Sequence, residues 1–167
     1  MLHLKTNDTM KKEYLFGIAG LVAGMILTGF LAYKSAPSMM LKEAESNYNF
    51  DRSVEVFTQT AEQMGWSIPT VHDMKETMAN FGYDVLNAKV FELCHPEHAV
   101  RILERDDERI VSSMMPCRVS IYEKSDGKTY VSWMNTAMMG NMMGGIVADV
   151  MGIASKESEQ MISSLTQ

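Results

Sequence analysis

The sequence predicts an α+β fold, a compact mixed sheet with packed helices, behind one N-terminal transmembrane helix. An uncharged apolar run near the N-terminus predicts the transmembrane helix. After it, segments whose apolar residues recur at helical spacing alternate with segments typical of β-strands, which predicts the α+β domain. The 167 residues, 46% of them hydrophobic, suffice for one domain with an anchor. This composition excludes disordered and collagen-like chains. The net charge of -6 argues against nucleic acid as a partner.

The apolar run spans residues 15–33 and contains no charged side chain. As a helix rising about 1.5 Å per residue it would be about 28 Å long, close to the hydrocarbon thickness of a bilayer. A cleaved signal peptide is the alternative, but its apolar region is usually about 7–15 residues long. We therefore predict a retained transmembrane helix and the membrane as a partner.

Lysines around this run predict its orientation. Lys11 and Lys12 stand just before it, and fewer lysines follow it closely than precede it. Because positive side chains favour the cytoplasmic side, residues 1–14 are predicted to form a cytoplasmic tail. The rest of the chain would then be a soluble domain that faces the periplasm or the cell exterior.

Residues 34–38 are predicted to be a short linker, and the α+β domain is expected at residues 39–135. Its first element would be a strand at residues 39–45. The next helix should begin with Asp51 as its N-cap and end at Gly65, because the apolar residues between them recur at helical spacing.

Residues 66–72 favour β-structure, although Pro69 restricts them to an edge strand or an extended loop. Asp73, followed by Glu76 three residues later, is typical of a helix start. We expect this short helix to end at Gly82.

Residues 85–93 have the composition of a strand, and Pro96 suits the first turn of a helix that continues to Leu103. Residues 119–124 and 129–134 flank the sequence Ser-Asp-Gly, which is typical of a turn between antiparallel strands. The predicted order after the anchor is therefore β, α, β, α, β, α, β, β.

Residues 136–167 are expected to form a C-terminal amphipathic helix. Its apolar side chains fall on one stripe: Met139, Met143, Ile146, Val150 and Ile153. The stripe would pack on the domain, on a partner or at the membrane surface. Because a small domain does not easily bury such a stripe alone, we predict a homodimer or a membrane-protein partner.

Several short blocks of sequence resemble a known family. In order, they are Val71–Met74 (VHDM), Phe91–Ala99 (FELCHPEHA), Met115–Arg118 (MPCR), Tyr122–Glu123 and Val131–Asn135 (VSWMN), followed by a tail rich in glycine and methionine. Together they are similar to the domain-of-unknown-function family 302 over roughly residues 40–160. The resemblance implies a compact α+β domain, often dimeric and sometimes carried behind an anchor, and it implies no activity. His95 departs from the pattern, which would have a small polar residue such as Asn there.

Cys94, Cys117 and His95 are the candidate metal ligands. Cys94 lies just before a predicted helix N-terminus, which can lower the pKa of a thiol, and Cys117 is expected to point towards the same core. Three interpretations remain open: inert buried thiols, a disulfide, and a metal or redox site. Further candidate site residues are His72, His98, Arg118 and Met115.

A site of thiols, imidazole and thioether would suit Cu(I) better than Mg²⁺ or Ca²⁺. The chain contains 17 methionines, although methionine also fills cores and adaptable interfaces. We expect His95 to face outward at the helix start, which argues against a bound metal. The cofactor is therefore left open, with Cu(I) as the candidate.

The sequence contains no recognisable catalytic motif, neither a phosphate-binding loop nor a paired-histidine zinc motif. We therefore predict a membrane-anchored extracytoplasmic binding or accessory domain of unknown ligand that self-associates. The alternative is a thiol- or copper-handling protein that uses Cys94 and Cys117.

Overall fold

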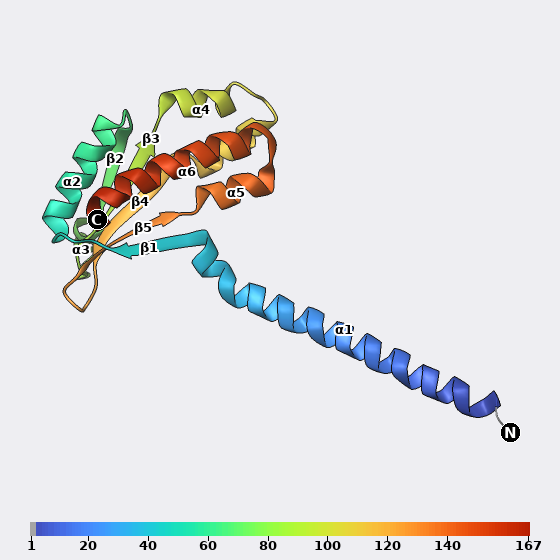
Figure 1. Ribbon diagram of the computed structural model, residues 1–167. Coiled ribbons are helices and arrows are strands. Elements are labelled where there is room, and N and C mark those ends of the chain that lie inside the picture. Colours follow the sequence, from blue (N-terminus) through green and yellow to red (C-terminus); the bar gives the residue numbers. More distant parts are fainter. Residues whose placement is uncertain (1–2) are drawn as a thin grey trace. The chain divides into compact units, whose positions relative to one another are not determined.

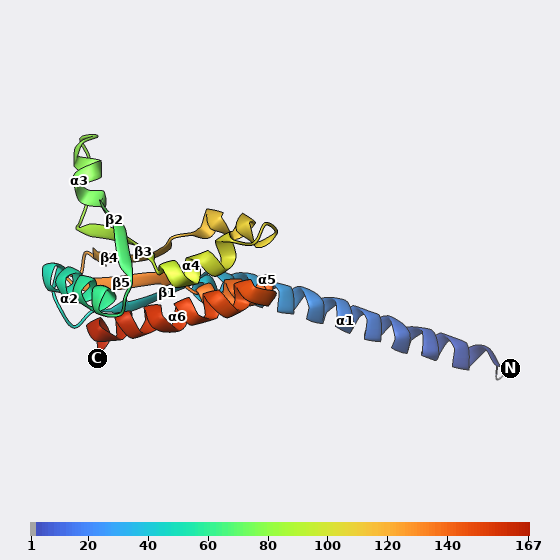
Figure 2. The ribbon, with the colours of Figure 1, turned by 90° about the horizontal axis from the view of Figure 1, so that it is seen from above.

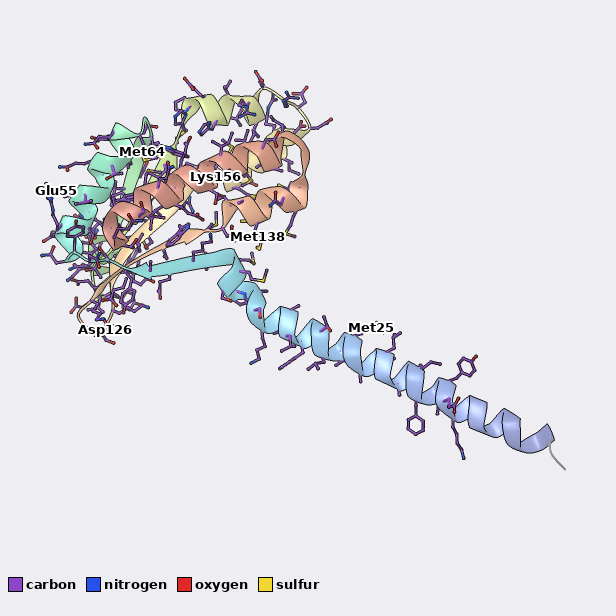
Figure 3. All side chains as sticks on the ribbon, in the orientation of Figure 1. Met25, Glu55, Met64, Asp126, Met138 and Lys156 are labelled. Atoms are coloured by element: carbon purple, nitrogen blue, oxygen red, sulfur yellow. The ribbon has the colours of Figure 1, made fainter. Side chains whose placement is uncertain are left out.

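The computed structural model describes residues 3–167, with side chains from residue 12 onward (Figure 1). The chain divides into two units, with the boundary between Ser38 and Met39. The described part of the first unit is helical and belongs to helix α1 (His3–Met40), whose last two residues fall in the second unit. Residues 12–40 of this helix are long and apolar enough to cross a membrane, with a mean hydropathy of 2.2 in the most apolar window. Side chains such as Met25 point away from the helix (Figure 3).

The predicted linker at residues 34–38 is part of helix α1, although it contains Pro37. Pro37 removes one main-chain donor, but the last turn holds a hydrogen bond from the Ser38 hydroxyl to the Ser35 carbonyl at 2.9 Å. Helix α1 therefore runs through these residues to Met40 instead of breaking at them.

The second unit contains a five-stranded antiparallel sheet, which confirms the predicted α+β class. The strands lie in the order β1-β5-β4-β3-β2. Their bounds are β1 Leu41–Glu45, β2 Ser67–Asp73, β3 Ala88–Cys94, β4 Cys117–Glu123 and β5 Thr129–Met134. The hairpin of β4 and β5 closes around Gly127, whose φ of 78° suits glycine.

The remaining elements are helices. They are α2 (Phe50–Gln63), α3 (Met74–Ala79), α4 (Pro96–Leu103), the 3₁₀ helix η1 (Glu108–Met114), α5 (Thr136–Met143) and α6 (Gly145–Thr166). Helices α2 and α6 lie side by side against one face of the sheet, and the main core lies between these layers (Figure 2). Phe57 from α2 and Phe91 from β3 meet there edge to face, with ring centroids 5.2 Å apart.

Two helix starts test the cap predictions. Helix α3 begins at Asp73 as predicted, and its side chain accepts a hydrogen bond from the Glu76 amide at 3.0 Å. The cap of α2 is Asn49 and not Asp51, because the Asn49 side chain reaches the Arg52 amide at 3.0 Å. Asp51 falls in the first turn instead, where its charge favours the helix dipole.

The predicted single tail helix is two helices, α5 and α6, separated at Gly144. Gly144 has a φ of 74°, which a continuous helix does not allow. The helices pack closely: a Cβ added to Gly140 would lie 2.7 Å from the Cβ of Met151. Val150, which belongs to the predicted stripe, is buried inside the domain. Val150 is therefore not free to contact a second copy of the chain, and self-association stays a prediction that rests on the other residues of the stripe.

Candidate functional site

A cavity of about 410 Å³ lies beside the ends of β3 and β4. Helices α4, η1 and α6 supply most of its other walls. Helices α4 and α6 lie side by side there (Figure 1). Most of its lining is aliphatic, and the side chains with sulfur or imidazole groups are Cys94, Cys117, Met114, Met115, Met151, His95 and His98. Five residues that the sequence singled out thus line one cavity: Cys94, Cys117, His95, His98 and Met115.

Strand pairing brings the two cysteines to this cavity. Leu93, the residue before Cys94, is opposite Cys117 in the antiparallel ladder of β3 and β4. Residues 95–116 leave the sheet as α4 and η1 and return to it at Cys117. Both cysteines are free thiols in the structure and not a disulfide.

The Cys117 thiol is held in its neutral form. Burial, and to a smaller extent the nearby Cys94, raise the pKa of Cys117 to about 11 from an ordinary value of 9.0. A thiol with this pKa is protonated near neutral pH and is a poor nucleophile. Cys117 therefore presents an uncharged, weakly polar surface to the cavity.

Two histidine rings stack at one side of the cavity. The centroids of His95 and His98 are 4.1 Å apart, and the ring planes are 22° apart. Both rings also meet the edge or face of Trp66, at centroid distances of 5.5 and 5.8 Å. The prediction that His95 faces outward is therefore wrong, because the buried indole of Trp66 gives its ring an aromatic surface to pack on.

Glu157 of α6 connects these aromatic residues. Its Oε2 atom accepts a hydrogen bond from Trp66 Nε1 at 3.0 Å and lies 2.9 Å from Nε2 of His98. In contrast, Nδ1 of His95 is buried and has no hydrogen-bond partner in the described part of the chain. Nitrogen and oxygen atoms of His95, His98 and Glu157 all lie within 4.8 Å of one another.

The other two candidates do not line the cavity, but both contact Glu92, which does. His72 and Arg118 pair with the carboxylate of Glu92, at 3.1 and 3.2 Å, and neither is among the described residues that line the cavity. Sequence reasoning missed Glu157 and the role of Trp66. Neither residue has a distinctive sequence signal: Glu157 lies in the polar stretch Ser155–Gln160, and no local pattern shows that residues 91 positions apart meet.

The arrangement suits binding more directly than it suits catalysis. Small-molecule sites are commonly concave, with volumes of about 300–1,000 Å³, mainly apolar walls and a few polar groups that orient the ligand. Here the aliphatic walls come mainly from α4, η1 and α6, and the ionisable groups of the lining include Glu92 and the two imidazoles of His95 and His98, which lie beside Glu157.

Comparison with known proteins gives a family and a fold. A family model described as "Domain of unknown function DUF302" matches residues 42–167. A crystal structure of an uncharacterised conserved DUF302 protein from Bacillus stearothermophilus is similar, with a TM-score of 0.68 and 18% sequence identity. The similarity covers 76% of this chain and 98% of that one. No curated protein matches. With the family model matching most of its length, the chain belongs to the DUF302 family.

Proposed function

We propose that this protein is a membrane-anchored binding domain that takes a small, largely apolar molecule into the cavity between α4, η1, α6 and the sheet. The cavity itself carries this proposal, since it combines about 410 Å³ of space with mainly aliphatic walls. The neutral thiol of Cys117 fits an apolar ligand better than a charged one. The imidazoles would then orient a polar group on the ligand.

The anchor belongs to the same proposal. Helix α1 supplies an apolar segment of sufficient length, and the lysines before it favour a cytoplasmic N-terminus. The domain would therefore bind its ligand in the periplasm or at the cell exterior. A ligand with apolar character is compatible with a protein held at the membrane surface.

The anchor predicts that the full-length chain stays in the membrane fraction. Washing membranes with alkaline carbonate should leave it there, because a spanning helix is not released by loss of surface charge interactions. Immunoblotting of pellet and supernatant measures this. Recovery of a soluble chain that begins near Pro37 would show that the segment is a cleaved signal peptide.

Filling the cavity should weaken binding. Ala99 lines the cavity, whereas its neighbour Val100 on α4 does not and is 52% exposed. The main core lies entirely within residues 39–167, and 98% of the similar crystal structure matches 76% of this chain. In this fragment we expect Ala99→Phe to weaken saturable binding of the fluorescent probe 8-anilinonaphthalene-1-sulfonate at least about tenfold, because the added ring occupies the ligand's volume.

Val100→Phe is the matched control, since it adds the same ring to the outer face of the same helix. Its probe affinity should equal that of the parent, and circular dichroism should show that both variants fold. Equal affinity in Ala99→Phe, or no saturable binding by the parent, would contradict the cavity as the binding site.

A copper- or thiol-handling function is the second candidate. The observation that favours it is that Cys94, Cys117, Met114 and Met115 line one cavity, which places soft donors together. The neutral state of Cys117 counts against a preformed thiolate site, although a metal ion can displace the proton. Stoichiometric Cu(I) binding lost in both Cys94→Ser and Cys117→Ser would favour this candidate over the first.

A further inference from the structure

We propose that His95, His98 and Glu157 form a binding site for a divalent zinc ion at the side of the cavity. The proposal concerns imidazole and carboxylate donors, so it is separate from the thiols and does not depend on which molecule the cavity holds. Its starting point is that the three side chains, from the start of α4 and the middle of α6, place donor atoms within 4.8 Å of one another.

The chemical types of the three donor atoms indicate which metal ion the site would bind. Two imidazole nitrogens and one carboxylate oxygen are ligands that Zn²⁺ commonly takes, whereas Ca²⁺ and Mg²⁺ prefer oxygen and Cu(I) prefers sulfur. Two ligands about 2.0–2.1 Å from a tetrahedral ion lie about 3.3–3.4 Å apart, so the 2.9 Å between His98 Nε2 and Glu157 Oε2 has to widen by only about 0.4 Å to admit the ion. Three protein ligands would leave a fourth position for water or for a group from the cavity.

Neighbouring residues already hold the carboxylate in place. The indole of Trp66 donates a hydrogen bond to Oε2 of Glu157 at 3.0 Å. Such an outer contact fixes the direction of a ligating side chain, and metal sites commonly have one. Trp66 is itself buried, so this contact has a rigid support.

The His95 ring supplies the independent observation. Its Nδ1 atom is buried without a hydrogen-bond partner in the described part of the chain, a condition that is rare in folded proteins. A metal ion would satisfy such an atom.

Binding requires one ring to turn. The two imidazoles are stacked with centroids 4.1 Å apart and planes 22° apart, so their nitrogen lone pairs lie in two nearly parallel planes and do not meet at one ion while the rings stay stacked. His98 is held by Glu157, whereas Nδ1 of His95 has no hydrogen bond to lose. We therefore expect His95 to rotate about its Cβ–Cγ bond and the stack to open when zinc binds.

The experiment is a zinc titration of the full-length chain in a non-ionic detergent, monitored by calorimetry and by the imidazole proton signals. The parent should bind one Zn²⁺ per chain and shift the signals of His95 and His98. His98→Asn and Glu157→Gln should each weaken binding about 100-fold or more, because each removes a donor. Glu157→Gln keeps an oxygen that can accept the hydrogen bond from Trp66, so this variant should fold. It therefore still tests the site if His98→Asn fails to fold.

His72→Asn is the matched control, because His72 also lies beside a glutamate, 3.1 Å from Glu92, but outside this cluster. Its zinc affinity should equal that of the parent. The proposal is overturned if the parent binds no stoichiometric zinc, or if Glu157→Gln binds it as tightly as the parent. Loss of zinc binding in Cys94→Ser and Cys117→Ser, with Glu157→Gln unaffected, would assign the ion to the thiols and also overturn it.

Discussion

Phe57→Ala is expected to destabilise the domain by about 3–5 kcal/mol, the range found for buried phenylalanine truncations. Phe57 is fully buried at 0% exposure and packs edge to face on Phe91, where α2 meets the sheet. Removing its ring leaves a cavity that close-packed neighbours do not fill. Urea unfolding of residues 39–167, followed by tryptophan fluorescence, measures the loss.

Phe81→Ala is the control for this substitution. It removes the same atoms from a side chain that is 72% exposed in the turn after α3. The free energy of unfolding should therefore change by no more than about 0.5 kcal/mol. Similar losses in the two variants would mean that the core does not lie between α2 and the sheet.

Local sequence signals predicted much of the fold because they act over few residues. The cap at Asp73, the proline at the start of α4 and the turn at Gly127 each depend on neighbours within one turn of chain. The same reasoning misplaced the cap of α2 by two residues, since Asn49 and Asp51 are both good cap residues. It also missed η1, because a short 3₁₀ helix has little periodicity to detect.

The site was harder to predict because distant residues build it. Cys94 and Cys117 approach one cavity because of the register in which β3 and β4 pair. The sequence indicated only that the two thiols share a core, and it did not indicate this register. The inward turn of His95 depends on Trp66, and the role of Glu157 depends on α6 packing beside α4. Glu157 lies 59 positions from His98 and 91 positions from Trp66 in the sequence, so no local pattern predicts that these side chains meet.

Because the Cys117 thiol is neutral, we expect alkylating reagents to react with it slowly in the folded chain. Its pKa of about 11, compared with an ordinary 9.0, lowers the thiolate fraction near neutral pH about 100-fold. In Cys94→Ser, iodoacetamide should therefore react with folded Cys117 about 100 times more slowly than with the urea-unfolded chain. The rate should rise about tenfold per pH unit towards pH 11. Burial is the main cause of the raised pKa, so most of it should survive the loss of Cys94.

Because the pKa of Cys117 is higher in the folded chain than in the unfolded chain, the free energy of unfolding should fall as the pH rises. Below about pH 9 the thiol is protonated in both the folded and the unfolded chain, so it does not affect the balance between them. Between about pH 9 and 11 the unfolded chain releases the proton and the folded chain retains it, so stability falls as pH rises, by roughly 3 kcal/mol in total. Cys117→Ser should remove this part of the decline in urea unfolding measured from pH 8 to 11. An unchanged decline in that variant, together with fast alkylation of folded Cys117, would show that the thiol is exposed to water and that the cavity wall at the start of β4 is open.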